Sequence, residues 1–209
     1  MRLLLIRHAE SSANAEGRLQ GHLDVPLSAR GRRESERLAE RVETFGVVAL
    51  YTSPLARARE TARIIAERIA PEALERPALM ERDVGELAGL TRDEILARFP
   101  QYAPARAARR SIDVPGFEDD EPFAQRVLAA FDEIVSAHPE QMVAVVTHGG
   151  VIGAFIRHAL ELPVVRPGPL TIDNASITTL DLGDGGGPAM PSQARLVSLN
   201  DTCHLLGGL

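Results

Sequence analysis

Two histidines and two arginines in this 209-residue sequence have neighbours that would let them bind and attack an anionic group. His8 directly follows Arg7, His148 precedes a pair of glycines, and Arg57 lies in a third segment between them. A neutral imidazole is a competent nucleophile at about pH 7, and guanidinium groups bind phosphate oxygens through paired hydrogen bonds. Close together, these side chains would need a bound anion to offset their positive charge.

Each of the three segments directly follows a short apolar run that is typical of a buried parallel strand. The runs are 3–6, 47–51 and 142–146. Alternating with them are amphipathic stretches that predict helices, over 28–45, 54–70, 122–137 and 151–162. The alternation predicts a layered α/β fold. Ligands in such folds bind beyond the carboxyl ends of the strands, so the three segments would meet at one edge of the sheet.

Two prolines mark the expected starts of predicted helices. Ser53 stands before Pro54, where a serine N-cap followed by proline at the first helical position is a common pattern. Glu121 before Pro122 is a weaker version of the same arrangement. We therefore expect helices to begin at these two places.

The second half of the chain also contains less regular segments. The ranges 174–182 and 195–199 read as the strands of a late hairpin. The stretch 97–120 has the least regular pattern, and we interpret it as a lid or insertion over the site. It contains three arginines that would either contact a second anionic group of the substrate or lie in a solvated loop: Arg106, Arg109 and Arg110.

The basic residues narrow the possible chemistry. All 23 are arginine, which excludes a Schiff-base lysine and a phosphate-loop lysine. The formal net charge of -6 argues against a general nucleic-acid surface, so no nucleic-acid partner is expected. A small phosphorylated substrate fits this composition better.

The length and the cysteine count set further limits. We expect 1–209 to form one domain, because a chain of this size builds a single core efficiently. Cys203 is the only cysteine, so the chain has no internal disulfide and no cysteine-built metal site. The opening apolar run is too short for a signal peptide, and no spanning segment is apparent. We expect a cytoplasmic protein without a membrane partner, and a homodimer is a candidate assembly.

Several separated motifs, in the right order over nearly the whole chain, resemble the histidine phosphatase superfamily, which includes the cofactor-dependent phosphoglycerate mutases. They are Arg7-His8-Ala9 followed by Glu10, Ser11 and Asn14, the run from Ser53 to Ala62, Glu81 with Gly85 and Gly89, and His148-Gly149, with lesser matches at Gly116, Glu118 and Asp173 to Ser176. Alanine replaces the glycine that the family has after its histidine. The resemblance implies a phosphoglycerate mutase-like fold, a three-layer α/β/α sandwich with a mostly parallel central sheet.

The resemblance also implies roles for individual residues. His8 would be the nucleophile that becomes phosphorylated, while Arg7, Arg57 and His148 would clamp the phosphoryl oxygens. Glu81 would protonate the leaving oxygen and then activate water, with Asp83 as the second candidate for this role. Four further residues would line the substrate pocket: Asn14, Gln20, Gly21 and Gly149. No metal and no cofactor would be needed.

Alternatives to a phosphomonoesterase remain at this point. One is a mutase that returns the phosphoryl group to the substrate, although the modest length favours hydrolysis. Another is a binding module that holds a phosphorylated ligand without turnover, which the filled catalytic positions disfavour. A zinc deaminase site, suggested by His8-Ala9-Glu10, is excluded because it requires a cysteine pair. The other four histidines are read as solvated or structural, and the sequence does not identify the substrate.

Overall fold

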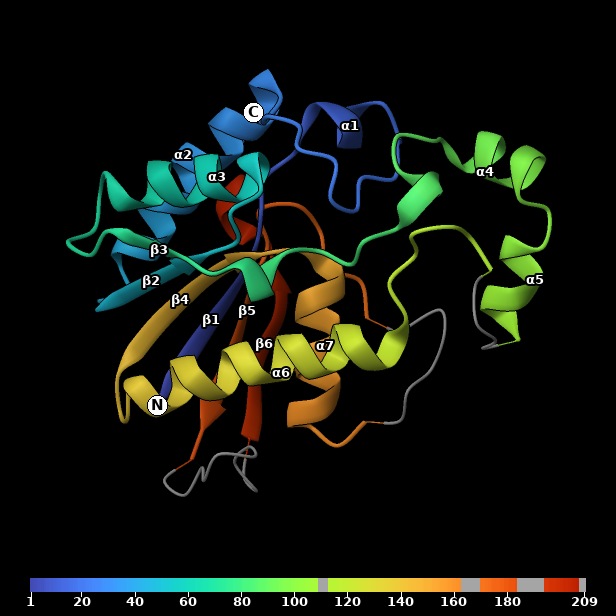
Figure 1. Cartoon of the computed structure of the whole chain (residues 1–209). Coiled ribbons are helices and arrows are strands. Elements are labelled where there is room, and N and C mark those ends of the chain that lie inside the picture. Colours follow the sequence, from blue (N-terminus) through green and yellow to red (C-terminus); the bar gives the residue numbers. More distant parts are fainter. Residues whose placement is uncertain (109–112, 163–169, 184–193, 207–209) are drawn as a thin grey trace.

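Six strands form the central sheet, in the order β3-β2-β4-β1-β5-β6 (Figure 1). We describe it from a computed structural model that covers residues 1–108, 113–162, 170–183 and 194–206. The strands are β1 Arg2–Arg7, β2 Ala49–Thr52, β3 Ala73–Glu75, β4 Met142–Thr147, β5 Ile177–Leu182 and β6 Ala194–Asp201. The first four in spatial order are parallel, whereas β5 runs antiparallel to β1 and β6 antiparallel to β5. The predicted, mostly parallel sheet is confirmed.

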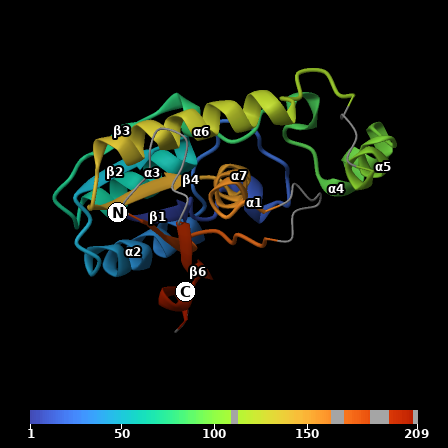
Figure 2. The same ribbon diagram turned by 90° about the horizontal axis from the view of Figure 1, so that it is seen from below.

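Helices cover both faces of this sheet. They are α1 Ser12–Ala15, α2 Ala29–Glu43, α3 Ala56–Ala66, α4 Arg92–Arg98, α5 Tyr102–Ala107, α6 Asp120–Ala137 and α7 Gly149–Ala159, with 3-10 turns η1 Pro77–Leu79, η2 Gly85–Leu87 and η3 Cys203–Leu205. Figure 2 shows α2 and α6 on opposite sides of the sheet, with α4 and α5 beyond one end of it. Within the described ranges, none of these helices combines the length and apolarity that a membrane crossing demands.

The alternation of side chains along the strands explains the two outer layers. On β1, Leu3 and Leu5 join the core cluster that contains buried residues of α6 and α7. Leu4 and Ile6 point the other way and join the cluster that contains residues of α2 and α3. Successive strand residues face opposite sides, so a continuous apolar run is what a strand covered on both faces requires. The structure is therefore the expected three-layer α/β/α sandwich.

Both helix starts predicted at prolines are wrong. Helix α3 begins two residues after Pro54, with Leu55 as its N-cap, and Ser53 makes its hydrogen bonds in the site described below. Helix α6 begins one residue before Glu121, with Asp119 as its N-cap. Acidic residues stabilise the positive end of a helix dipole, which explains why the helix extends in this direction, and proline is tolerated in a first turn.

The stretch 97–120 is more regular than the sequence suggested. It includes α5 and the last residues of α4, a helix whose start is fixed by a capping box at Thr91 and Glu94. A third apolar cluster lies beneath these helices, built from Val84, Leu87, Ile95, Phe99 and Val114. The lid role of this stretch stays a prediction. The late hairpin is present as β5 and β6, and the short strand β3 was not predicted.

Candidate active site

The two site histidines follow neighbouring strands at the same level. Arg7 at the end of β1 pairs in register with Thr147 at the end of β4, so His8 and His148 leave the sheet side by side. Their ring centroids are 5.1 Å apart, and both side chains are buried. The two histidines therefore lie at one edge of the sheet, as expected for residues that follow parallel strands. This is the edge where the chain leaves β1 towards α1 (Figure 1).

One backbone carbonyl determines which nitrogen of His8 carries the hydrogen. Nδ1 of His8 lies 2.8 Å from the carbonyl oxygen of Ala9. A carbonyl can only accept, so Nδ1 donates and Nε2 keeps its lone pair. Arg57 Nε donates to this Nε2 at 3.3 Å. The nitrogen with the free electron pair therefore faces the guanidinium that would hold a phosphoryl group.

The surroundings keep His8 neutral. Burial, followed by the charges of Arg7 and Arg57, lowers the pKa of His8 well below its ordinary value. The pKa of His148 is lowered in the same way, by burial first and then by Arg57, His8 and Arg7. Both imidazoles are thus unprotonated at neutral pH, which is the state that a nucleophilic histidine requires.

Arg57 is held rigidly by the loop that follows α1. Its guanidinium donates to the carbonyl oxygens of Gly21 and Leu23, each at 2.8 Å, and the residue is 1% exposed. Burial lowers the pKa of Arg57 to about 10, with opposing effects from Glu81 and Asp24. The side chain therefore stays a cation at neutral pH and is fixed in place beside His8.

Two polar atoms in the site have no hydrogen-bond partner. They are Nε of Arg7 and Nδ1 of His148, both buried. The other groups are engaged, because Arg7 Nη1 donates to Ile172 at 2.6 Å and His148 Nε2 lies 2.8 Å from Ser53 Oγ. An unsatisfied buried polar group costs on the order of 1–3 kcal/mol, and an anion bound between these groups would satisfy both.

Glu81 completes the site at the start of α7. Its Oε2 accepts a hydrogen bond from the backbone N–H of Gly150 at 3.0 Å, and its Oε1 accepts one from the N–H of Arg82 at 2.8 Å. A Cβ on Gly150 would lie 2.2 Å from Glu81 Oε1, so glycine is what permits this approach. Asp83 instead accepts from Gly85 N and lies 3.5 Å from His22 Nδ1. The geometry favours Glu81 over Asp83 for contact with the reacting group.

The predicted pocket residues lie around these groups. The side-chain oxygens of Asn14 and Gln20 lie 2.9 and 2.7 Å from the Ser11 hydroxyl oxygen. Gly21 supplies a carbonyl to Arg57, and Gly149, the first residue of α7, lies against the Arg7 side chain. Their contacts thus support the site residues themselves, and contact with substrate stays a prediction. Arg106 lies in α5, whereas Arg109 and Arg110 lie outside the described residues.

Several supporting residues were not assigned to the site from the sequence. Arg126 on α6 donates to the carbonyls of Ala78, Met80 and Glu81 and pairs with Glu118, so it anchors the segment that carries the Glu81 carboxylate. His22, read as solvated or structural, lies 2.7 Å from the carbonyl oxygen of Glu81. These contacts join segments far apart in the chain, so no local spacing signalled them.

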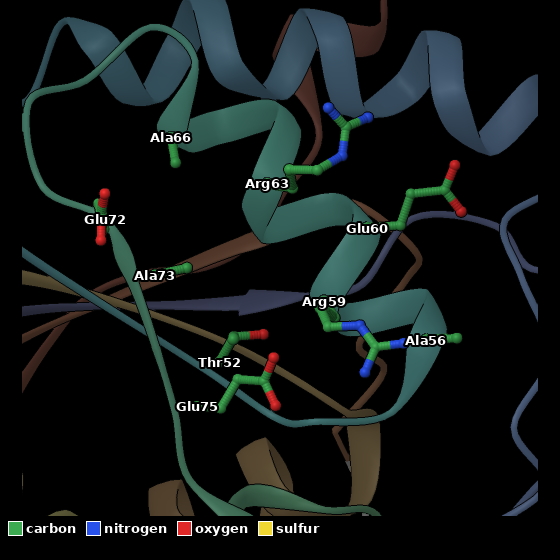
Figure 3. Close-up of a pocket in the computed structure, with 9 residues that line it drawn as sticks. All are labelled: Thr52, Ala56, Arg59, Glu60, Arg63, Ala66, Glu72, Ala73 and Glu75. Atoms are coloured by element: carbon green, nitrogen blue, oxygen red, sulfur yellow. The ribbon is translucent and has the colours of Figure 1, made fainter.

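The cavity drawn in Figure 3 lies elsewhere, between α3 and the edge strand β3. Its volume is about 480 Å³, and it is lined by Thr52, Ala56, Arg59, Glu60, Arg63, Ala66, Glu72, Ala73 and Glu75. None of the predicted site residues lines it. In the part of the chain that the structure describes, no cluster of three histidine, cysteine or carboxylate side chains could hold a metal ion.

An imidazole whose unprotonated Nε2 faces a guanidinium, with a carboxylate at the same edge of an α/β/α sandwich, agrees with an enzyme that transfers a phosphoryl group to histidine. The family model for the histidine phosphatase superfamily (branch 1) matches residues 3–192. The chain therefore belongs to the histidine phosphatase superfamily, and it is an enzyme of the phosphatase class.

Individual relatives differ in their named activities. The chain is 35% identical to phosphoglycerate mutase-like protein 4 of Arabidopsis thaliana, covering 99% of this chain and 90% of that protein. It is 37% identical to the metal-independent phosphoserine phosphatase of the same plant, and the match covers 87% of this chain and 76% of that protein. The solved structure of a mycobacterial glucosyl-3-phosphoglycerate phosphatase matches this fold with a TM-score of 0.84 at 30% identity. The match covers 95% of this chain and 98% of that one.

Proposed function

We propose that the chain is a metal-independent phosphomonoesterase that hydrolyses a small phosphorylated metabolite through a phosphohistidine on His8. The observation that carries this proposal is the lone pair on His8 Nε2, fixed by the hydrogen bond between Nδ1 and the carbonyl of Ala9. It lies beside Arg57, in the site where Arg7 Nε and His148 Nδ1 have no hydrogen-bond partner. The names of two relatives, a phosphoserine phosphatase and a glucosyl-3-phosphoglycerate phosphatase, support the reaction type.

In the first step, His8 Nε2 attacks phosphorus and the ester P–O bond breaks. Glu81, as the carboxylic acid, gives its proton to the leaving oxygen, so the product leaves as a neutral alcohol. Arg7 and Arg57 neutralise charge on the phosphoryl oxygens and neutral His148 donates a hydrogen bond to them, which is the main contribution a protein makes to this reaction.

In the second step, Glu81 as carboxylate takes a proton from water. The water oxygen bonds to phosphorus while the P–N bond to His8 breaks, which releases inorganic phosphate and regenerates neutral imidazole. Glu81 is then protonated again, ready for the next substrate. One carboxyl group can serve both steps because each step reverses the proton transfer of the other.

The test is hydrolysis of a panel of phosphomonoesters, with chelator present, between about pH 5 and pH 8. The wild type is expected to turn over at least one ester, whereas His8→Ala should lose activity by several orders of magnitude. Acid-labile phosphate on the protein should be trapped only when His8 is present. His158→Ala, an exposed histidine on α7, serves as the matched control. Full activity of His8→Ala would reject the mechanism.

Mutase-type transfer is the second candidate, favoured by the name of the Arabidopsis phosphoglycerate mutase-like relative. A mutase would hold phosphohistidine until a substrate hydroxyl accepts the group, instead of passing it to water. Interconversion of phosphoglycerates that depends on a bisphosphorylated primer, with little phosphate release, would establish this candidate. Phosphate binding without any turnover would instead indicate a binding module.

The proposal includes a cytoplasmic location, which a chain with a single cysteine favours. A homodimer stays a prediction, and light scattering of the purified chain tests it.

A further inference from the structure

One face of α7 leads away from the phosphate site towards the leaving-group side. Gly149 lies against Arg7, Gly150 against the Glu81 carboxylate, and Gly153 against the guanidinium of Arg157. Residues three and four apart lie on the same side of a helix, so Gly150, Gly153 and Arg157 follow one another along this face. The face carries the catalytic carboxylate at its start and a cation one turn further on.

The side chain of Arg157 folds back along the helix towards the site. A Cβ on Gly153 would lie 3.6 Å from Arg157 Nη2, an ordinary contact distance. Long helical side chains point towards the N-terminus of their helix, and the absence of a side chain at Gly153 leaves room for this one. A Cβ on Gly150 would lie 2.2 Å from Glu81 Oε1. Since Cβ positions three apart are about 5–6 Å from each other, the Arg157 guanidinium lies within about 12 Å of the Glu81 carboxylate.

Arg157 is half-buried without a compensating charge. Among the described residues, no carboxylate lies within ion-pair distance of its guanidinium. Burial lowers the pKa of Arg157, and the neighbouring charge of Arg82 lowers it further. The positive charges of Arg157 and Arg82 thus repel each other.

Arg82 follows Glu81 in the chain, and its charge acts on Arg157. Its backbone N–H binds the Glu81 carboxylate at 2.8 Å, and its guanidinium lies 4.1 Å from the centroid of the Phe123 ring. Nη1 pairs with Asp120 at 3.0 Å and donates to the carbonyl of Glu118 at 2.8 Å. Arg82 is therefore anchored from one side, while Arg157 approaches from α7.

We propose that Arg157, with Arg82 beside it, forms a second anion-binding subsite that recognises a carboxylate or a second phosphate on the leaving group. The inference rests on the proposed phosphatase function and adds to it a class of substrate. Glu81 must contact the ester oxygen, so a subsite beyond Glu81 receives groups a few bonds further along the leaving group. A second negative charge on the substrate would neutralise the guanidinium of Arg157, which would discriminate against esters that lack this charge.

The test uses two esters that differ in one group. 3-Phosphoglycerate has a carboxylate where glycerol 3-phosphate has a hydroxymethyl group. We expect Arg157→Gln to lower the ratio of kcat/KM for 3-phosphoglycerate over glycerol 3-phosphate about tenfold, the loss typical of a charge-assisted hydrogen bond. Arg157→Lys keeps the charge and should restore part of the ratio. Glycerol 1,3-bisphosphate, which has a second phosphate and no carboxylate, shows in the same series whether the second anion is a carboxylate or a phosphate.

Arg63→Gln is the matched control, because Arg63 is exposed on α3 beside the cavity of Figure 3 and far from α7 in the fold. It should leave the ratio unchanged. An unchanged ratio in Arg157→Gln, or an equal loss for both esters, would overturn the proposal.

A binding measurement separates this inference from the proposed function. In a His8→Ala background, calorimetry with 3-phosphoglycerate and glycerol 3-phosphate reports the subsite without turnover. If the wild type hydrolyses no ester, the phosphatase proposal fails, while a selective loss of 3-phosphoglycerate binding in Arg157→Gln still supports the subsite. Equal binding of both esters, with and without Arg157, rejects the subsite alone.

Discussion

At the scale of single residues, the site keeps its imidazoles neutral while surrounding them with cations. His8 and His148 are buried beside Arg7 and Arg57, and each charge disfavours protonation of the rings. A bound phosphoryl group would offset the positive charge of these arginines. The free site is therefore arranged for an anion, and this preorganisation is what electrostatic catalysis requires.

Arg57 should not be replaceable by lysine. Its planar guanidinium group donates simultaneously to the carbonyl oxygens of Gly21 and Leu23 and to His8 Nε2. An ammonium group cannot reproduce this geometry. We expect Arg57→Lys to lower kcat/KM roughly a hundredfold on any accepted ester, measured by phosphate release. Arg59→Lys, at an exposed position on the same helix, is the control and should retain activity. Nearly equal rates for both variants would show that Arg57 acts only as a positive charge.

The residue types at the site could be predicted from the sequence. The protonation state of His8 and the position of the Glu81 side chain could not. His8 and His148 follow predicted strands, and the family motifs point to Glu81. The free lone pair of His8 depends on the carbonyl of Ala9, and the position of Glu81 depends on Arg126, which lies 45 residues further along the chain. Such contacts follow from backbone geometry and tertiary packing, which local spacing does not encode.

At the scale of elements, the start of α7 joins His148 to the Glu81 carboxylate. His148 is its N-cap, and the N–H of Gly150 in its first turn holds Glu81. Helix starts carry free N–H groups and a positive dipole end, so they stabilise a carboxylate beside a phosphate. Ser53 was expected to cap a helix, yet it lies 2.8 Å from His148 instead, because α3 begins only after Leu55.

Gly150→Ala tests whether the close approach of Glu81 matters. The new Cβ would lie 2.2 Å from Oε1, so the carboxylate must move, while alanine itself favours helix formation. We expect kcat to fall roughly tenfold or more with no loss in the free energy of unfolding. Trapped phosphohistidine should persist longer, because its hydrolysis needs Glu81. Wild-type kcat with normal stability would mean that the carboxylate reaches its place without this glycine.

At the scale of the whole molecule, the parallel sheet is the part that sequence patterns determine best. The continuous apolar runs follow from coverage on both faces, as the clusters on either side of β1 show. The strand β3 has three residues and α1 has four, too few for a periodic pattern, so both were missed. The helices around 92–107 pack on their own small cluster, which explains why their pattern differs from that of the main core.

The two buried histidines should also make the stability of the whole chain depend on pH. Their pKa values are lowered well below the ordinary value in the folded state, whereas in the unfolded chain both take up protons as the pH falls through about 6.5. Below that pH the unfolded state binds more protons, so the free energy of unfolding decreases as the pH falls and recovers as it rises. Each histidine contributes a slope of at most about 1.4 kcal/mol per pH unit.

Urea unfolding between about pH 5 and pH 7, in phosphate-free buffer, measures this slope. The double variant His8→Asn/His148→Asn should have a shallower slope than the wild type, because two sites of proton uptake are removed from the unfolded chain. Carboxylates that titrate in the same range are shared by both proteins and cancel in the difference. His158→Asn, at an exposed position, should keep the wild-type slope. Equal slopes for the double variant and the wild type would mean that the buried imidazoles accept protons without unfolding, and the neutral nucleophile would lose its physical basis.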